Sequence, residues 1–409
     1  LILRFDDTDT SIKPPLPWAY KKIEEEVEWL TGQKPTKVIT VSDRMETYYE
    51  YAEKLISMGG AYICTLTAEE FREYRVSKTD SPCRDRTVNE NLELWIKMLE
   101  GGFKPGEAVV RIKTNMQLKN PALRDWPALR LQDTSSKPHP RKNIGSKYIV
   151  WPLLDFQSAI DDHLEGVTHI IRGKDLMDST RKQILLYEHF EWAYPETIYW
   201  GRVKIHEFGG FSTSGMRVKI EDGAYEGWDD PRLPTIASLQ RRGLNPEALK
   251  SFWIELGLTQ KDISASLATL FSHNTTIIDP ESPRLSFVRN PTEIKLKSDS
   301  TNFRIENISS AVHPEFPELG TRELKMTWIG DTASIIVESE DIKDKQQFRL
   351  KEFANISISD ENATIDSFEL ITGVPIIHWL PLTEGGYISA ELLTVENGEI
   401  IKNKGFIEK

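Results

Sequence analysis

The sequence predicts an α/β plus all-β protein of several domains: an α/β domain with an insertion, a helical block and a β-rich tail. Strand-like and helix-like segments alternate at the start of the chain, which is typical of a parallel sheet. Residues 235–271 have a helical pattern with short breaks, and beyond Asp279 short β-type runs follow at modest intervals. The chain has 409 residues, enough for roughly two to four domains.

The first 60 residues read as strand, helix, strand, helix. The strand LIL is followed by a helix that begins near Pro17, then by the β-type run KVITVS and by a helix from Arg44 to Met58 that ends at two glycines. Apolar residues recur at helical spacing in the first helix at Ala19, Ile23, Val27 and Leu30. This order predicts a parallel α/β sheet.

From about Ala61 the pattern changes. A helix is predicted to begin after Thr67, because Glu70 stands at capping-box spacing from it. NENLELWIKMLEGG predicts another helix and AVVRIKTNM a strand. The α/β pattern resumes with YIVWPLLDF and the strand GVTHIIRG, and residues 184–193 are predicted to be helical. TIASLQRRG, NPEALKSFWIELG and DISASLATLF predict the helical block, and the runs from EIKLKS to YISAELLTV predict antiparallel barrels.

Composition excludes some functions. The net charge of −12 argues against indiscriminate binding to nucleic acid or anionic membranes. Residues 137–147 and the pair Arg241 and Arg242 are candidates for a local basic surface. No apolar run is long enough for a membrane span, and no signal peptide is visible, so we expect a cytoplasmic protein. Cys64 and Cys83 fit a reducing compartment, with one disulfide bridge or half of a metal site as the alternatives.

The segment RFDDTD follows the first strand, where ligands bind in parallel α/β sheets. Its carboxylates suit an amino group or a ribose hydroxyl; the alternative is a turn that caps the next helix. In residues 155–175 a metal cage is disfavoured, because Asp161, Asp162 and His163 are consecutive and neighbours on a helix point to different faces. Arg172 stands just past an apolar strand, where it can bind a carboxylate through a bidentate pair. The alternative is that Arg172 forms a structural ion pair.

Two further segments stand out. FGGFSTSGMR (208–217) is predicted to be a flexible, hydroxyl-rich loop of a kind that wraps phosphates. GWDDPRLPT (227–235) combines Trp, Pro and opposite charges within nine residues, which predicts one rigid, charged turn.

Taken together, these stretches resemble class I glutamyl-tRNA synthetases of the archaeal and eukaryotic type, with the glutaminyl enzymes as close relatives. The matching segments extend over nearly the whole chain: LILRFDDTD, VSDRMETYYEYAEKLISMGGAYI, SPCRDRTVNENLELWIKM, VVRIKTNM, PLLDFQSAIDDHLEGVTHIIRGKD, GWDDPRLPTIASLQRRG and HPEFPELGTRE.

The resemblance implies five parts. Residues 1–60 and 146–205 are the two parts of an incomplete Rossmann-like nucleotide-binding fold, and residues 61–145 between them form an inserted domain for the acceptor end of tRNA. Residues 206–278 form a KMSKS-like loop and a helical subdomain that contacts the inner side of the tRNA. Residues 279–409 form an antiparallel β-barrel region that reads the anticodon. In the family, a strand–helix unit with the HIGH signature precedes the strand that ends in RFDDTD. We therefore expect the chain to be truncated at its N-terminus, and the resemblance of IIKNKGFIEK to a point inside the last barrel leaves open whether closing strands follow.

The implied reaction joins L-glutamate to tRNA(Glu) with ATP and Mg²⁺, through glutamyl-adenylate. Arg4 and Asp6 are assigned to the substrate site, where Asp6 matches the acidic residue that holds the α-amino group. Arg172 matches the position that pairs with the side-chain carboxylate; glutaminyl enzymes lack this Arg. At Leu154 relatives commonly have a Tyr that contacts the substrate, and Leu cannot donate that hydrogen bond.

The resemblance also places the ATP site. Asp175, Ser212, Thr213 and Ser214 are assigned to ATP binding, and Ser214 matches the serine of the KMSKS loop. Gly215 stands where a catalytic Lys is expected, and losing that charge costs about two to three decades in rate unless a neighbour such as Arg217 or Lys219 replaces it.

We expect no zinc. Relatives carry two Cys-x-Cys pairs in the segment of Cys64 and Cys83, but the partner positions are Leu66 and Ser81, and structural zinc sites use four ligands. The expected partners are tRNA(Glu), L-glutamate and ATP, without a membrane and with the protein as a monomer. The sequence leaves open whether tRNA(Gln) is also charged. Two alternative functions remain. One is a glutaminyl enzyme, which Arg172 disfavours, and the other is a non-catalytic tRNA-binding paralogue, which Leu154, Gly215 and the missing HIGH unit favour.

Overall fold

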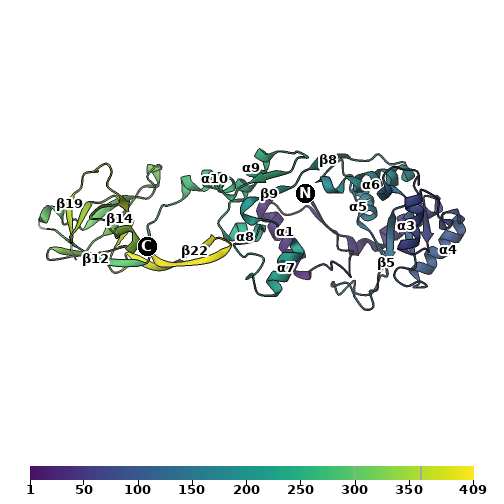
Figure 1. Ribbon diagram of the computed structural model, residues 1–409, viewed down its shortest axis with the longest axis horizontal. Helices are drawn as coiled ribbons and strands as arrows, with labels where there is room; N and C mark the ends of the chain where they lie inside the picture. Colours follow the sequence, from purple (N-terminus) through teal and green to yellow (C-terminus); the bar gives the residue numbers. More distant parts are fainter. Residues whose placement is uncertain (299, 360–361) are drawn as a thin grey trace. The chain divides into compact units, whose positions relative to one another are not determined.

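The computed structural model describes residues 1–298, 300–359 and 362–409, and the chain forms two compact units. The first comprises residues 1–206 and 253–265, and the second comprises residues 207–252 and 266–409 (Figure 1).

The first unit contains three parallel strand pairs and one antiparallel sheet. The strands are β1 (Ile2–Phe5), β2 (Lys37–Thr40), β3 (Ala61–Cys64), β4 (Val109–Ile112), β5 (Pro127–Leu131), β6 (Val150–Pro152), β7 (His169–Gly173), β8 (Glu196–Trp200), β9 (Val203–Ile205) and β10 (Ile263–Ala265). The helices are α1 (Pro17–Thr31), α2 (Met45–Ser57), α3 (Ala68–Ser77), α4 (Val88–Leu99), α5 (Leu154–Leu164) and α6 (Met177–Phe190), while α9 (Pro246–Leu256) spans the boundary between the units.

The parallel strands predicted from the sequence are present as separate pairs. β1 pairs with β2, so that Leu3 lies opposite Val38, and β7 pairs with β8, so that Ile171 lies opposite Ile198. β3, β4, β5 and β6 form an antiparallel sheet in that order. The expectation that YIVW resumes the parallel pattern is therefore wrong: β6 completes the antiparallel sheet, and the parallel pattern resumes at β7.

The core of this unit lies between the antiparallel sheet and the helices beside it. α2, α4, α5 and α6 contribute apolar side chains to it, among them Tyr48, Trp95, Phe156 and Leu186, all essentially without exposed surface. Figure 1 shows α5 and α6 close together, and side-chain hydrogen bonds join them. This packing fixes the two helices that carry much of the site described below.

Two local predictions have clear outcomes. The capping box before α3 is confirmed, since Thr67 Oγ1 accepts a hydrogen bond from Glu70 N at 3.2 Å and Glu70 Oε2 accepts one from Thr67 N at 2.8 Å. The helix expected over 184–193 begins earlier, as α6 starts at Met177. After Met177 its first turns carry the polar residues DSTRKQ, so no apolar stripe could be recognised there from the sequence.

The second unit combines short helices with β-structure. Its helices are α7 (Thr213–Glu221), α8 (Ile236–Arg241), α10 (Leu267–Ile278) and α11 (Ser339–Ile342). Its strands are β11 (Phe287–Arg289), β12 (Pro291–Lys297), β13 (Asn307–Ala311), β14 (Thr321–Lys325), β15 (Trp328–Ile329), β16 (Thr332–Glu338), β17 (Gln347–Leu350), β18 (Asn355–Ser359), β19 (Asn362–Ser367), β20 (Ile376–Ile377), β21 (Trp379–Pro381), β22 (Tyr387–Glu396) and β23 (Glu399–Glu408).

The β-rich tail departs from the expected antiparallel pattern at two ladders. Strands β15, β16, β12, β19, β18, β17 and β20 follow one another in one sheet, with β21 beside β16, and β12–β19 and β17–β20 are parallel pairs. β22 and β23 form a long antiparallel hairpin, which extends as a ribbon in Figure 1. The helical block also differs at one point, because residues 263–265 form strand β10 and the helix begins only at Leu267.

Candidate amino-acid site

A cavity of about 360 Å³ opens in the first unit at the ends of β1 and β7. Arg4 and Asp6 reach it from β1, Leu154 from the first position of α5, and Arg172 from β7. The carboxyl ends of parallel strands are where α/β sheets bind ligands. The four residues that the sequence assigned to the substrate therefore line one cavity.

One side of this cavity carries two carboxylates around one guanidinium group. Arg4 Nε lies 3.0 Å from Asp6 Oδ1, and Arg4 Nη1 lies 2.8 Å from Asp162 Oδ1. Burial raises the pKa of Asp6, although Arg4 partly offsets this effect, and the two carboxylates outweigh burial and raise the pKa of Arg4. With both carboxylates ionised, this side has one negative charge in excess and suits an ammonium group.

Arg172 provides the opposite charge. Its Nη1 donates hydrogen bonds to Thr180 Oγ1 at 3.3 Å and to Gln183 Oε1 at 3.0 Å, both of which are uncharged acceptors on α6. Among the described residues, no carboxylate forms an ion pair with Arg172. The structural ion pair considered from the sequence is thus not found in this part of the chain, and the guanidinium charge remains available to an anion.

Gln183 was not predicted as a site residue. It is 1% exposed, and its Nε2 donates to Ser158 Oγ at 2.7 Å while Tyr194 OH donates to its Oε1 at 2.7 Å. It lies 11 positions beyond Arg172 on a helix expected to begin only at residue 184. No local sequence signal marks it, because its role depends on how α6 packs against α5.

The acidic run that suggested a metal cage is divided among different surroundings. Asp161 is fully buried and accepts a hydrogen bond from Tyr48 OH at 2.7 Å, Asp162 pairs with Arg4, and the His163 ring stacks on Trp192 with 3.6 Å between centroids. Burial raises the pKa of both Asp161 and Tyr48. In the described parts of the chain, no group of three or more His, Cys, Asp or Glu side chains is arranged to hold a metal ion.

Asp175, assigned to ATP, does not line the cavity. It follows β7 and turns back toward Gly173, where an added Cβ would lie 2.5 Å from Asp175 Oδ1. Its carboxylate is exposed beside the strand that carries Arg172. Its role toward ATP stays a prediction.

The remaining residues assigned to ATP and catalysis lie in the second unit at the start of α7. The predicted flexible loop is only partly a loop, because the helix begins at Thr213 and Ser212 Oγ accepts a hydrogen bond from Gly215 N at 3.1 Å. Ser212 Oγ and Ser214 Oγ lie 3.4 Å apart on the surface. Exposed hydroxyls at the amino end of a helix fit phosphate oxygens. Arg217 already pairs with Glu221 at 2.7 Å, which reduces its value as a replacement for a lysine at position 215.

The segment GWDDPRLPT forms a charged, hydrogen-bonded turn, and its rigidity stays a prediction. Asp230 is fully buried and accepts hydrogen bonds from Arg232 Nη2 at 2.7 Å and from the backbone N–H of Glu226 at 3.0 Å. These bonds outweigh burial and lower the pKa of Asp230 to about 2. Thr235 caps α8 by accepting a hydrogen bond from Ser238 N.

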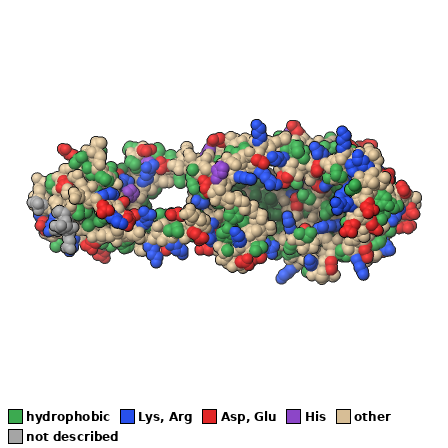
Figure 2. Space-filling model, viewed as in Figure 1, with side chains coloured by type: hydrophobic (Ala, Val, Ile, Leu, Met, Phe, Trp, Pro, Cys, Tyr) green, Lys and Arg blue, Asp and Glu red, His purple; other side chains and the backbone are tan. Residues whose placement is uncertain are grey.

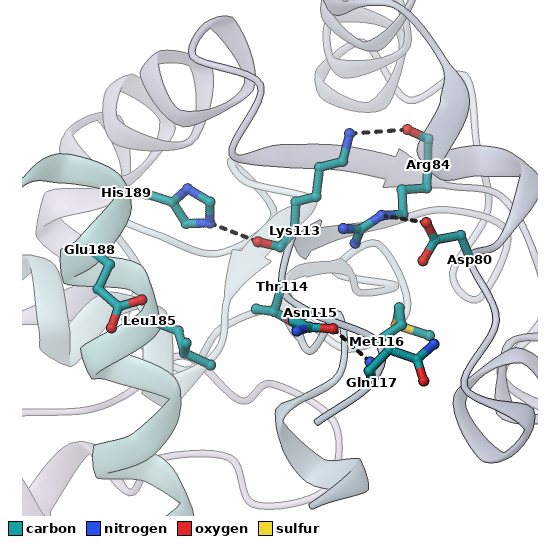
Figure 3. Close-up of a pocket in the computed structure, with 10 residues that line it drawn as sticks. All are labelled: Asp80, Arg84, Lys113, Thr114, Asn115, Met116, Gln117, Leu185, Glu188 and His189. Carbon is teal, nitrogen blue, oxygen red and sulfur yellow. Dashed lines mark hydrogen bonds and ion pairs between the residues drawn. The ribbon is translucent and has the colours of Figure 1, made fainter. Parts of the chain in front are cut away.

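A second cavity of about 610 Å³ in the first unit shows a different arrangement of charge (Figure 3). Arg84 lines it, yet its Nη1 is 2.6 Å from the fully buried Asp125 and its Nε is 3.5 Å from Asp80. Figure 3 shows His189 turned to the backbone oxygen of Lys113, at 2.7 Å. The guanidinium group of Arg84 is thus already neutralised by carboxylates, which distinguishes this cavity from the one beside Arg172.

The two cysteines are buried free thiols in one small apolar cluster with Tyr62, Phe71 and Met116. On the face shown in Figure 2, Lys and Arg side chains are interspersed with Asp and Glu. None of the described helices has the length and apolar character needed to cross a membrane.

Comparison with known proteins decides the family. Residues 1–280 match the catalytic domain of class I tRNA synthetases (E and Q), and residues 282–371 match the anticodon-binding domain of the same group. The chain belongs to the class I tRNA synthetases for glutamate and glutamine.

Two relatives that match at 45% identity agree with this assignment. The glutamate--tRNA ligase of Methanosarcina mazei is 45% identical over 394 residues, which cover 93% of this chain and 66% of that protein. The glutamate--tRNA ligase of Pyrococcus abyssi is 45% identical over 419 aligned positions, covering 100% of this chain and 70% of that protein. The chain thus spans about two thirds of the length of these class I synthetases. A solved glutamate tRNA ligase from Elizabethkingia meningosepticum shares 18% identity with a TM-score of 0.47 over 69% of this chain and 63% of that one.

Proposed function

We propose that the protein ligates L-glutamate to the 3′ end of tRNA(Glu), with ATP, during protein synthesis in the cytoplasm. A glutamate carboxylate oxygen attacks the α-phosphorus of ATP, the bond to pyrophosphate breaks, and a ribose hydroxyl of the tRNA then displaces AMP from the glutamyl carbonyl. The family match and relatives named glutamate--tRNA ligase support this proposal.

The observation that carries the choice of amino acid is the charge pattern of the cavity. The carboxylates of Asp6 and Asp162 suit the α-ammonium group. Arg172, whose acceptors among the described residues are both uncharged, suits a second carboxylate. Glutamine would leave the charge of Arg172 without an anionic partner. The glutaminyl alternative is therefore the weaker proposal for this site.

ATP and Mg²⁺ are part of the proposal. The exposed hydroxyls of Ser212, Thr213 and Ser214 at the start of α7 would bind phosphate oxygens, and Asp175 supplies an exposed carboxylate in the first unit. Mg²⁺ is usually bound through substrate phosphates and one or two carboxylates, so it would enter with ATP and neutralise charge on the phosphates. These residues fit that mode, which needs no dedicated protein cage.

The parts of the chain receive roles on the same basis. The anticodon-binding match over residues 282–371 supports anticodon reading by the β-rich tail. We assign residues 61–145 to the acceptor end of the tRNA and the helical block from 227 to its inner side. The protein acts as a monomer in this proposal, which leaves open whether tRNA(Gln) is charged as well.

The test is a charging assay with labelled glutamate or labelled glutamine, ATP, Mg²⁺ and tRNA, with tRNA retention on filters recorded in the same samples. Charging with glutamate and not with glutamine is expected. Charging with glutamine alone supports the glutaminyl alternative. Retention of tRNA with no charging supports the non-catalytic paralogue, which Leu154 and Gly215 favour.

A further inference from the structure

We propose that Gln183 is a specificity-determining positioning residue: its uncharged amide holds Arg172 in place and leaves the guanidinium charge free for the carboxylate of the substrate. The inference rests on the proposed function and adds to it the group that keeps the site selective for an anionic side chain.

First, Arg172 uses one of its three guanidinium nitrogens for hydrogen bonds within the described chain. Both of its hydrogen bonds within the described chain leave from Nη1, to Thr180 and Gln183. Nε and Nη2 have no acceptor among the described residues. A guanidinium group presents its donors in a planar fork that matches a carboxylate. Fixing one nitrogen on α6 therefore orients the remaining donors without using them.

The second step is the direction in which Gln183 faces. Ser158 Oγ donates its proton to Leu154 O at 2.6 Å, so toward Gln183 it can only accept, and it accepts from Nε2. Tyr194 OH and Arg172 Nη1 both approach Oε1. The amide oxygen is thereby placed toward Arg172, because the reversed amide would direct its NH₂ group at a cation.

The third step is charge. Glutamate has nearly the shape of glutamine, and at position 183 it would place a carboxylate about where Oε1 now lies, 3.0 Å from Arg172 Nη1. The same unit shows the consequence of such a neighbour, because Arg84 forms an ion pair with the buried carboxylate of Asp125. Glutamine at position 183 keeps the hydrogen bond and omits the competing anion.

The experiment compares charging kinetics with glutamate and with glutamine for the wild-type protein and three variants. Gln183→Glu adds the charge and keeps the acceptor, while Gln183→Leu removes the acceptor and adds no charge. Thr180→Asp places a carboxylate at the other acceptor of Arg172, so that either charged variant that folds gives the answer. Gln132→Glu is the matched control, since Gln132 is also buried and hydrogen-bonded but serves Thr10 outside the cavity.

We expect either charged variant to raise KM for glutamate and to lower the ratio of kcat/KM for glutamate over glutamine by about tenfold or more, as for loss of one charge-assisted hydrogen bond. Gln183→Leu should retain more of the ratio, and the Gln132→Glu control all of it. An unchanged ratio in the folded charged variants overturns the inference alone, as does an equal loss in Gln183→Leu, which would indicate packing. A wild-type protein that does not prefer glutamate overturns the proposed function, and this inference with it.

Discussion

Arg4 Nη1 lies 2.8 Å from Asp162 Oδ1, and this contact joins β1 to α5 across 158 positions of sequence. Arg4 also holds Asp6 through Nε at 3.0 Å. One guanidinium group thus orders two carboxylates that arrive from distant parts of the chain. It keeps Asp6 directed at the cavity. Because one guanidinium group neutralises only one of the two carboxylates, the remaining negative charge attracts an ammonium group.

Glutamate binding should depend on the ionisation of Asp6. Burial raises the pKa of Asp6 above its ordinary value of 3.8, and a bound ammonium group favours the charged form. Affinity should therefore be greatest above the raised pKa and fall as the pH falls through it, at a higher pH than for an ordinary aspartate. Calorimetric titration of glutamate from neutral pH downward measures this.

The Asp6→Asn variant serves as the control for that titration. It should bind glutamate about tenfold more weakly at neutral pH and lose the part of the pH dependence seen between neutral pH and the ordinary carboxyl range. A variant with the same pH profile as the wild-type protein would show that another group is responsible.

Gly215→Lys should accelerate charging. The substitution restores a cation at the position that the KMSKS resemblance assigns to lysine, and a regained phosphate contact is worth about two to three decades in kcat. An added Cβ would lie 3.0 Å from Ser212 Oγ, a hydroxyl that can shift slightly. Single-turnover charging rates measure the effect. Gly210→Lys is the control, because a Cβ there meets no atom of the described residues within 4 Å. Equal rates for both variants would argue against the assignment of Gly215.

Asp230→Asn should destabilise the second unit by about 1–3 kcal/mol at neutral pH, since it weakens the hydrogen bonds to Arg232 and to the backbone at Glu226. The pKa of Asp230 is lowered from 3.8 to about 2, so its stabilising effect is complete above 3.8 and is lost as the pH falls toward 2. The difference in unfolding free energy between wild type and variant should shrink over that window.

Urea unfolding at several pH values tests this point. Asp229→Asn is the matched control, because Asp229 is exposed and lies 3.6 Å from Arg241 in an ion pair worth about 0–1 kcal/mol. If the two variants lose the same stability, the buried turn does not have the role given to it here.

Strand ends and capping residues could be predicted from the sequence because their signals are local. Asp6 follows an apolar strand, Arg172 lies near the end of another, and Thr67 stands three residues before Glu70, so their neighbours alone suggest their positions. Gln183 could not be found this way, since its function arises from contacts with Ser158 on another helix. The parallel ladder between β12 and β19 joins segments more than 60 residues apart, and alternating β-type runs carry no information on such pairing.

The most direct test of the central claim is calorimetric binding of glutamate and glutamine to the wild-type protein and to Arg172→Met. Arg181→Met is the matched control, because Arg181 lies on the exposed side of α6 and pairs with Asp178 outside the cavity. We predict that the wild-type protein and the control bind glutamate in preference to glutamine, and that Arg172→Met loses about a hundredfold in glutamate affinity while its glutamine affinity changes little. Unchanged glutamate affinity in Arg172→Met would contradict the assignment of this cavity as a glutamate site.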